Sequence, residues 1–108
     1  MTPIAQTPEP PYYAAIFTTV QSDDAEGYVD MAKRMFALAA EQPGYLGFEI
    51  AGSSPLGIGI SYWTDEDSIR SWKANAEHQE AQDLGRTKWY DQYQLRIAKV
   101  ERDYGFPA

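Results

Sequence analysis

The sequence predicts an α+β fold of the ferredoxin-like class, in which two helices cover one face of a four-stranded antiparallel sheet. Three observations support this prediction. The hydrophobic pattern changes along the chain in the order β-α-β-β-α-β, which is the element order of that fold. The 108 residues suffice for one domain with a buried core. The first strand is apolar on both of its faces, which is typical of a sheet covered on both sides.

The first strand follows a proline-rich start. Residues 1–11 carry four of the seven prolines, which predicts a flexible tail ahead of a single domain at residues 12–106. Residues 12–20 are aromatic and β-branched, as strands prefer. Both alternating faces of this strand are apolar, yet the chain holds only enough sequence to cover one face of the sheet. A second copy is therefore expected on the other face, which would give a homodimer.

The first helix is predicted after the acidic and hydroxyl side chains of residues 22–24, which suit a helix N-terminus. Apolar residues then recur at helical spacing from Tyr28 to Ala39. Pro43 and Gly44 end the helix, because proline cannot continue it and glycine suits the turn. Residues 45–51 are expected to form the second strand.

The third strand, residues 56–63, has an unusual alternation. Leucine, isoleucine and tyrosine point to one face, whereas Gly57, Gly59 and Ser61 point to the other. A strand face with almost no side chains allows another group to approach closely. That group could be a tightly packed helix or sheet, or a ligand in a cavity over this face.

A second helix is predicted from Asp65, with Thr64 as its N-cap and with Ile69 and Trp72 buried. Its apolar stripe fades at Gln79, so the helix either leaves the core there or borders a polar cavity. Residues 84–90 are expected to form a short helical turn or loop. Residues 93–102 alternate as a long fourth strand.

Composition excludes several classes of function. The net charge of −7 argues against binding to nucleic acid phosphates. Without cysteine and with one histidine, the chain lacks the usual ligand sets for zinc or non-haem iron, so no metal is expected. No nucleotide fingerprint is present, and no cofactor is expected. No apolar run approaches the length of a membrane span, and the start lacks the features of a signal peptide. A soluble, cytoplasmic protein is the default expectation.

Several segments together resemble one family. They are QPGYLGFE at 42–49, SYWTDEDSIRSWK at 61–73, the Glu77-His78 pair, and GRTKWY leading into VERDYGF. The chain is similar, over residues 12–106, to the antibiotic biosynthesis monooxygenase superfamily of dimeric α/β-barrel proteins, and within it to a subgroup of uncharacterised bacterial proteins. The resemblance implies the ferredoxin-like dimer. Some members oxygenate aromatic compounds without metal or flavin, using the electrons of an ionised phenol or dihydroquinone.

Other members of the superfamily degrade haem through a histidine that follows a tryptophan by ten residues. Trp72 matches that tryptophan, but Gln82 stands at the position of the histidine. His78 comes six residues after Trp72, which places it about two-thirds of a turn away around the helix. The resemblance therefore disfavours haem degradation.

The candidate catalytic residues lie on the second helix and just after it. Ser71, Asn75, His78 and Gln82 lie at i, i+4, i+7 and i+11 of the second helix and form one stripe, which adjoins its buried face. His78 is the candidate base, because an unperturbed imidazole titrates near neutrality. A partly exposed histidine bonded to Glu77 or Gln82 is the alternative.

Arg86 and Asn75 are the candidate polar anchors for a phenolate or peroxide oxygen. A guanidinium donates several hydrogen bonds, although an ion pair with a nearby carboxylate is the alternative role for Arg86. Substrate-binding walls are predicted from one amide and four aromatic residues, and the aromatic ones could equally belong to the core or to a dimer interface. The five are Tyr62, Trp72, Gln82, Trp89 and Tyr90.

The sequence therefore supports two functional hypotheses. The leading one is a cofactor-independent monooxygenase that acts on a small aromatic or quinol-like molecule. The rival is a non-catalytic dimeric protein of the same fold that binds small hydrophobic molecules.

Overall fold

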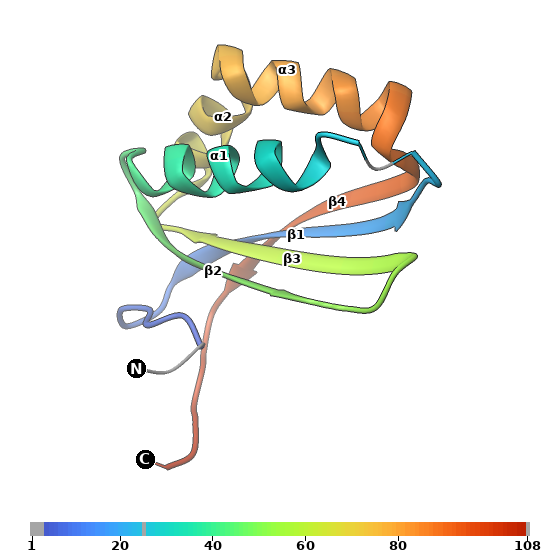
Figure 1. Cartoon of the computed structure of the whole chain (residues 1–108). Helices are drawn as coiled ribbons and strands as arrows, with labels where there is room; N and C mark the ends of the chain where they lie inside the picture. The colour runs from blue at the N-terminus through green and yellow to red at the C-terminus, as the bar shows by residue number, and fades with distance from the viewer. Residues whose placement is uncertain (1–3, 25, 108) are drawn as a thin grey trace.

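The computed structural model describes residues 4–24 and 26–107 and confirms the α+β ferredoxin-like fold. Within the described residues, all the helices lie on one face of the sheet (Figure 1). The elements in chain order are β1 (Tyr12–Gln21), α1 (Tyr28–Ala40), β2 (Tyr45–Ala51), β3 (Leu56–Trp63), α2 (Glu66–Ala74), α3 (Ala76–Leu84), a π-helical turn η1 (Gly85–Trp89) and β4 (Tyr90–Val100).

The sheet has the strand order β2-β3-β1-β4, and every neighbouring pair is antiparallel. The register places Ala15 beside Ser61 and Ile97 on the helix side of the sheet. Ile16 lies beside Ile60 and Arg96 on the opposite side, which we call the outer face. The sheet is open, with β2 and β4 as its edges.

The core forms between the sheet and the helices and is richest at the end where β3 leads into α2. Trp63, the last residue of β3, is fully buried, and its indole lies 6.3 Å from that of Trp72 in a stacked arrangement. Ala15, Ala39 and Ile69 complete this buried cluster. The small alanines let the sheet and α1 approach closely around the two indoles.

The helix starts differ from the sequence prediction. Helix α1 begins at Tyr28 after Gly27, whose φ of 82° is left-handed, and no side chain caps it. Ser22 instead donates its hydroxyl to the carbonyl of Lys88, 2.5 Å away, because the β1–α1 loop packs against η1. Helix α2 is capped by Asp65, whose carboxylate accepts from the N–H of Ser68 at 2.7 Å, and not by Thr64.

The second predicted helix is two helices in the structure. Asn75 has extended backbone angles, φ −60° and ψ 131°, so α2 ends and α3 begins there. Its side-chain oxygen accepts hydrogen bonds from the N–H groups of Glu77 and His78 at 3.0 and 3.3 Å. Asparagine is one of the preferred N-cap residues. Here its extended backbone ends α2, and its side chain caps the start of α3. None of the helices in the described part of the chain is long and apolar enough to cross a membrane.

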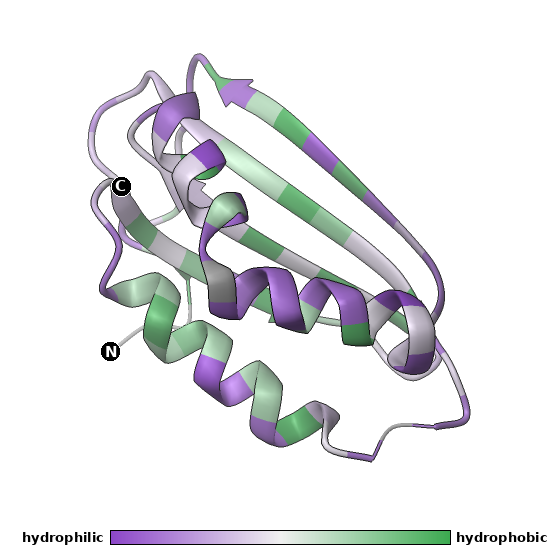
Figure 2. Cartoon of the chain, turned by 90° about the horizontal axis from the view of Figure 1, so that it is seen from above, coloured by the Kyte–Doolittle hydropathy of each residue, from purple (hydrophilic) through white to green (hydrophobic). Residues whose placement is uncertain are grey.

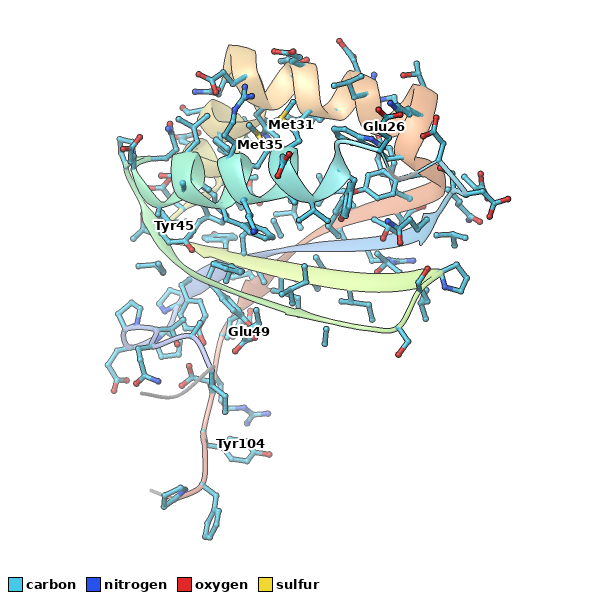
Figure 3. All side chains as sticks on the ribbon, viewed as in Figure 1. Glu26, Met31, Met35, Tyr45, Glu49 and Tyr104 are labelled. Carbon is cyan, nitrogen blue, oxygen red and sulfur yellow. The ribbon has the colours of Figure 1, made fainter. Side chains whose placement is uncertain are left out.

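The segments before β1 and after β4 both lie on the outer-face side of the sheet. The N–H of Ala5 donates to the carboxylate of Glu49 at 3.0 Å, and Figure 3 shows Glu49 below the sheet, away from the helices. The hydroxyl of Tyr12 donates to Asp103 at 2.5 Å. Tyr104 projects from the C-terminal segment and is 95% exposed. The flexibility of residues 1–11 stays a prediction, and residues 1–3 lie outside the described part.

Candidate functional site

A cavity of about 690 Å³ lies between the helices and the sheet. Its floor includes Gly57, Gly59 and Ser61, the small-residue face of β3. A Cβ atom added at Gly59 would meet no heavy atom within 4 Å, so the space over this glycine is open. Of the two alternatives left by the sequence, a close-packed neighbour or a ligand cavity, the structure supports the cavity.

The walls of the cavity are mainly apolar and come from both layers. Helix α1 contributes Tyr28, Met31, Met35 and Phe36, and α1 and α3 run side by side over the sheet (Figure 2). Figure 3 shows both methionines on α1. Flexible thioether side chains adapt to ligands of irregular shape. The size and the lining are those of a small-molecule site.

His78 lies in this wall, held by two contacts to Trp72. Its ring stacks on the indole with the centroids 4.2 Å apart and the planes 15° apart. Its Nδ1 lies 2.9 Å from the carbonyl oxygen of Trp72. A carbonyl can only accept, so Nδ1 carries the proton and the neutral ring keeps its lone pair on Nε2.

The surroundings of His78 favour this neutral form. Burial lowers the pKa of the imidazole below its ordinary value, and the charge of Lys73 acts in the same direction. The hydrogen bond to the Trp72 carbonyl opposes the shift but does not outweigh burial. A neutral imidazole with a free lone pair can accept a proton at neutral pH.

Three of the predicted aromatic wall residues do line the cavity. Trp72 and Trp89 are buried, with 9% and 4% of their surface exposed. The indole of Trp89 donates to the carbonyl of Glu26 at 3.0 Å, which holds the ring against the start of α1. Tyr90 also lines the cavity, and its hydroxyl donates to that of Tyr28 at 3.1 Å. Burial raises the pKa of Tyr90 far above its ordinary value, so this phenol stays protonated.

Gln82 lies one helical turn after His78 on α3 and lines the same cavity. Its Oε1 is buried and has no hydrogen-bond partner among the described residues. An unpaired buried carbonyl oxygen is costly, and most such groups in proteins are satisfied. Gln82 therefore lines the cavity with other atoms of its side chain, while its Oε1 has almost no accessible surface there.

Arg86 does not reach the cavity. Its Nε donates to the hydroxyl of Tyr93 at 2.9 Å, and its guanidinium lies 3.6 Å from the carboxylate of Asp83. The side chain is 52% exposed. Tyr93 does line the cavity, so Arg86 contacts the site through this phenol. Both the ion pair and this contact arise because η1 turns Arg86 outward.

Tyr62 lies on the outer face, on the opposite side of the sheet from the cavity. It neighbours Ala14 in the register, and its hydroxyl donates to Glu49 at 2.6 Å. Burial and this carboxylate raise its pKa well above the ordinary value. Asn75 uses its side-chain oxygen to cap α3. The structure thus brings five of the eight predicted site residues to the cavity: Trp72, His78, Gln82, Trp89 and Tyr90.

Sequence reasoning missed the contribution of α1 and of the β4 edge. Tyr28, Met31 and Met35 fall on the apolar stripe of α1, a pattern that by itself indicates only core packing. Tyr93 and Leu95 come from β4. The small-residue face of β3 and the apolar stripe that fades at Gln79 were the sequence signals compatible with a cavity, and neither pointed to α1 or β4. Among the described residues, no group of three or more histidine, aspartate or glutamate side chains is placed to hold a metal ion.

Comparison with known proteins identifies the family. The sequence model of the antibiotic biosynthesis monooxygenase family matches residues 11–84, which include most of the sheet and the helices up to the end of α3. The chain belongs to this family. The match runs from β1 to α3, so it includes His78 and Gln82 but stops before Trp89.

Two proteins are related to this family member in sequence. The chain is 48% identical over 100 residues to the uncharacterised protein YqjZ of Bacillus subtilis, spanning 92% of this chain and 88% of that protein. It is 30% identical over 92 residues to the jasmonate monooxygenase ABM of Pyricularia oryzae. That match covers 82% of this chain but only 43% of the fungal protein.

Solved structures share the fold at low sequence identity. A mutant of SnoaB, a cofactor-independent oxygenase from Streptomyces nogalater, superposes with a TM-score of 0.72 and 15% identity, covering 90% of this chain and 98% of that one. Rv0793 from Mycobacterium tuberculosis gives a TM-score of 0.75 at 7% identity, covering 87% and 99%. These similarities show the fold of this antibiotic biosynthesis monooxygenase family member and do not assign its substrate.

Proposed function

We propose that this protein is a cofactor-independent monooxygenase that oxidises a small quinol-like aromatic compound in the cavity between the helices and the sheet. The observation that carries the proposal is His78, a neutral imidazole with a free Nε2, in an otherwise mainly apolar and aromatic wall. The family and the structural similarity to a cofactor-independent oxygenase are consistent with this chemistry.

The proposed reaction needs no electron source besides the substrate. Nε2 of His78 accepts the phenolic proton, and the resulting phenolate transfers an electron to dioxygen. The radical pair combines into a peroxide, and the protonated imidazole donates to the developing anion. The O–O bond then breaks with loss of water. With the substrate written as RH₂, the balance is RH₂ + O₂ → R=O + H₂O, so the substrate supplies all the electrons.

The remaining site residues have supporting roles in the proposal. Trp72, Trp89 and Tyr90 form flat walls against which an aromatic ring can stack. Asn75 acts as a positioning residue, because it caps the first turn of α3 where His78 lies. Arg86 orients the phenol of Tyr93.

We infer that the working molecule is a homodimer in which a second copy covers the outer face. Leu56 and Ile58 lie on this face and are 51% and 40% exposed, next to the apolar Ile16 and Ile60. Contiguous exposed apolar side chains on a sheet mark an interaction surface. Two copies meeting face to face through a two-fold axis would bury them.

Oxygen consumption tests the enzymatic proposal. The wild-type protein and the variant His78→Phe, which keeps an aromatic ring beside Trp72, are supplied with 1,4-dihydroxynaphthalene in an oxygen electrode. We expect the wild type to exceed the protein-free rate and the variant to lose about a hundredfold or more of that excess. Equal rates in the two proteins would remove His78 from the mechanism. Ligand-induced thermal stabilisation without oxygen uptake would instead support the non-catalytic binding protein.

A further inference from the structure

We propose that two ion pairs, each between Glu49 of one protomer and Arg96 of the partner subunit, fix how two copies of this chain meet. The inference deepens the proposed homodimer, on which it rests, and is independent of the proposed reaction. The geometry that carries it is the position of these two side chains in one row of the outer face, at opposite edges of the sheet.

The row is set by the register of the four strands. Arg96 of β4 pairs with Ile16 of β1, and Ile16 also pairs with Ile60 of β3. Ile60 in turn pairs with Glu49 of β2. Directly opposed residues point to the same face of a sheet, so two isoleucines separate a carboxylate from a guanidinium. Among the described strand residues with a register partner, these two carry the charge of the outer face, because Lys99 lies on the helix side.

Both charged groups are available to a second copy. Arg96 is exposed on the edge strand, and no described side chain forms an ion pair with it. Glu49 is half-buried and accepts one hydrogen bond on each oxygen, from the hydroxyl of Tyr62 at 2.6 Å and from the N–H of Ala5 at 3.0 Å. An ionised carboxylate has about four acceptor positions. Glu49 is therefore held in place and can still accept from a guanidinium.

Two-fold symmetry allows two limiting ways to lay one outer face on another. An axis along the strands, midway between β3 and β1, exchanges the edges, so that β2 lies over β4 of the second copy. Glu49 then faces Arg96 of the partner subunit, and the pair occurs twice because both copies use the same surface. An axis across the strands through this row lays β2 over β2. It sets two glutamates against each other and likewise two arginines.

Charge decides between the two arrangements, because the isoleucines at the centre of the row meet in both. Packed sheets lie about 10 Å apart, a gap that a glutamate and an arginine bridge from opposite sides. The planar guanidinium matches a carboxylate with two hydrogen bonds. Like charges that face each other across an interface are strongly unfavourable. The outer face is therefore complementary to itself only when the axis runs along the strands.

Charge reversal at the two positions tests the inference. The dissociation constant of the dimer is measured by sedimentation for the wild type, Arg96→Glu, Glu49→Lys and the double variant. We expect each single variant to raise this constant at least about tenfold, because two attractive pairs become repulsive. The double variant restores both attractions and should lie within about threefold of the wild type.

Lys99→Glu is the matched control for these reversals. It makes the same change of charge on the same edge strand, but on the helix side of the sheet, and should leave the dissociation constant unchanged. Single reversals at Glu49 and Arg96 that dimerise as tightly as the wild type would overturn the pairing. A double variant as weak as the single ones would do the same.

Glu49→Gln covers the case in which the lysine variant fails to fold, because the amide oxygen can still accept from Tyr62. In the wild type this change removes an attraction, and we expect a weaker dimer. In the Arg96→Glu variant it removes a repulsion, and we expect a tighter one. A shift of the same sign in both backgrounds would contradict the pairing.

The same measurements separate the pairing from the dimer itself. A wild-type protein that stays monomeric at all concentrations would remove both. A wild-type dimer that is insensitive to charge at the two positions would keep the dimer and remove the pairing. The oxygen-consumption experiment, which tests the reaction, enters neither result.

Discussion

The side-chain oxygen of Asn75 accepts a hydrogen bond from the backbone N–H of His78, at 3.3 Å. The same oxygen accepts from Glu77 at 3.0 Å, so one amide satisfies two of the free donors at the start of α3. The candidate base therefore lies in the capped first turn of a short helix, and its ring reaches back to the end of the preceding helix.

Removing this cap should loosen the position of His78. We expect Asn75→Ala to lower the free energy of unfolding by about 1 kcal/mol, the usual cost of losing an N-cap. It should also lower kcat more than it raises KM, because the imidazole is misplaced while the walls remain. Asn75→Asp keeps a side-chain acceptor and should restore both the free energy of unfolding and kcat. Denaturant unfolding and steady-state kinetics measure them. Wild-type kcat in the alanine variant would rule out a positioning role.

Burial of His78 predicts a pH dependence of stability with a definite sign. Because the pKa is lowered in the folded protein, the unfolded chain takes up the proton first as pH falls. The stabilisation that the neutral, buried imidazole contributes to folding is fully present above pH 6.5, the pKa in the unfolded chain. It is lost as the pH falls from there through the lower pKa of the folded protein. Urea unfolding of the wild type and of His78→Gln is measured across this pH range. The difference between their free energies of unfolding isolates the effect of the imidazole. A difference that stays constant with pH would show that the ring is not buried in its neutral form.

Filling the space over Gly59 should weaken ligand binding without harming the fold. A side chain there meets no described atom within 4 Å at its Cβ, and aromatic residues suit strands better than glycine. We expect Gly59→Phe to weaken binding of the dihydroxynaphthalene probe by about tenfold or more, the cost of losing about 1.4 kcal/mol, with the melting temperature unchanged or raised. Gly105→Phe is the matched control, because Gly105 is equally unobstructed but lies in the C-terminal segment. Full affinity in the Gly59 variant would place the ligand elsewhere.

A charge placed among the exposed apolar side chains of the outer face should prevent dimer formation. Ile58 is 40% exposed on that face, and an unpaired arginine buried between two sheets is strongly unfavourable. We expect Ile58→Arg to sediment as a monomer, while Val29→Arg, at an exposed aliphatic position on α1, behaves as the wild type. A monomeric wild-type protein would contradict the inferred dimer directly.

Arg86 should act on the site only through Tyr93. A double-mutant cycle with Arg86→Met and Tyr93→Phe tests this, because the two side chains share one hydrogen bond of 2.9 Å. We expect Arg86→Met to lower kcat/KM by a few-fold in the wild type and to have no further effect once the Tyr93 hydroxyl is absent. Additive losses would mean that Arg86 contacts the substrate independently.

The sequence by itself determined the element order, the sheet and the two-sided apolar strands. The spacing of apolar side chains shows these directly, because it repeats every 2 residues in a strand and every 3.6 residues in a helix. The glycine face of β3 left open either a close-packed neighbour or a cavity, and the structure decided for the cavity. Tertiary structure alone decided which aromatic residues meet there. Tyr62 lies on the outer face because the β3 register places it beside Ala14.

The position of Asn75 also required the three-dimensional structure. Helical spacing placed it on one stripe with His78 and Gln82, but its cap breaks the helix. That break turns His78 back onto Trp72 and leaves Nε2 free. Local spacing cannot reveal such a contact, because it depends on where one helix ends and the next begins.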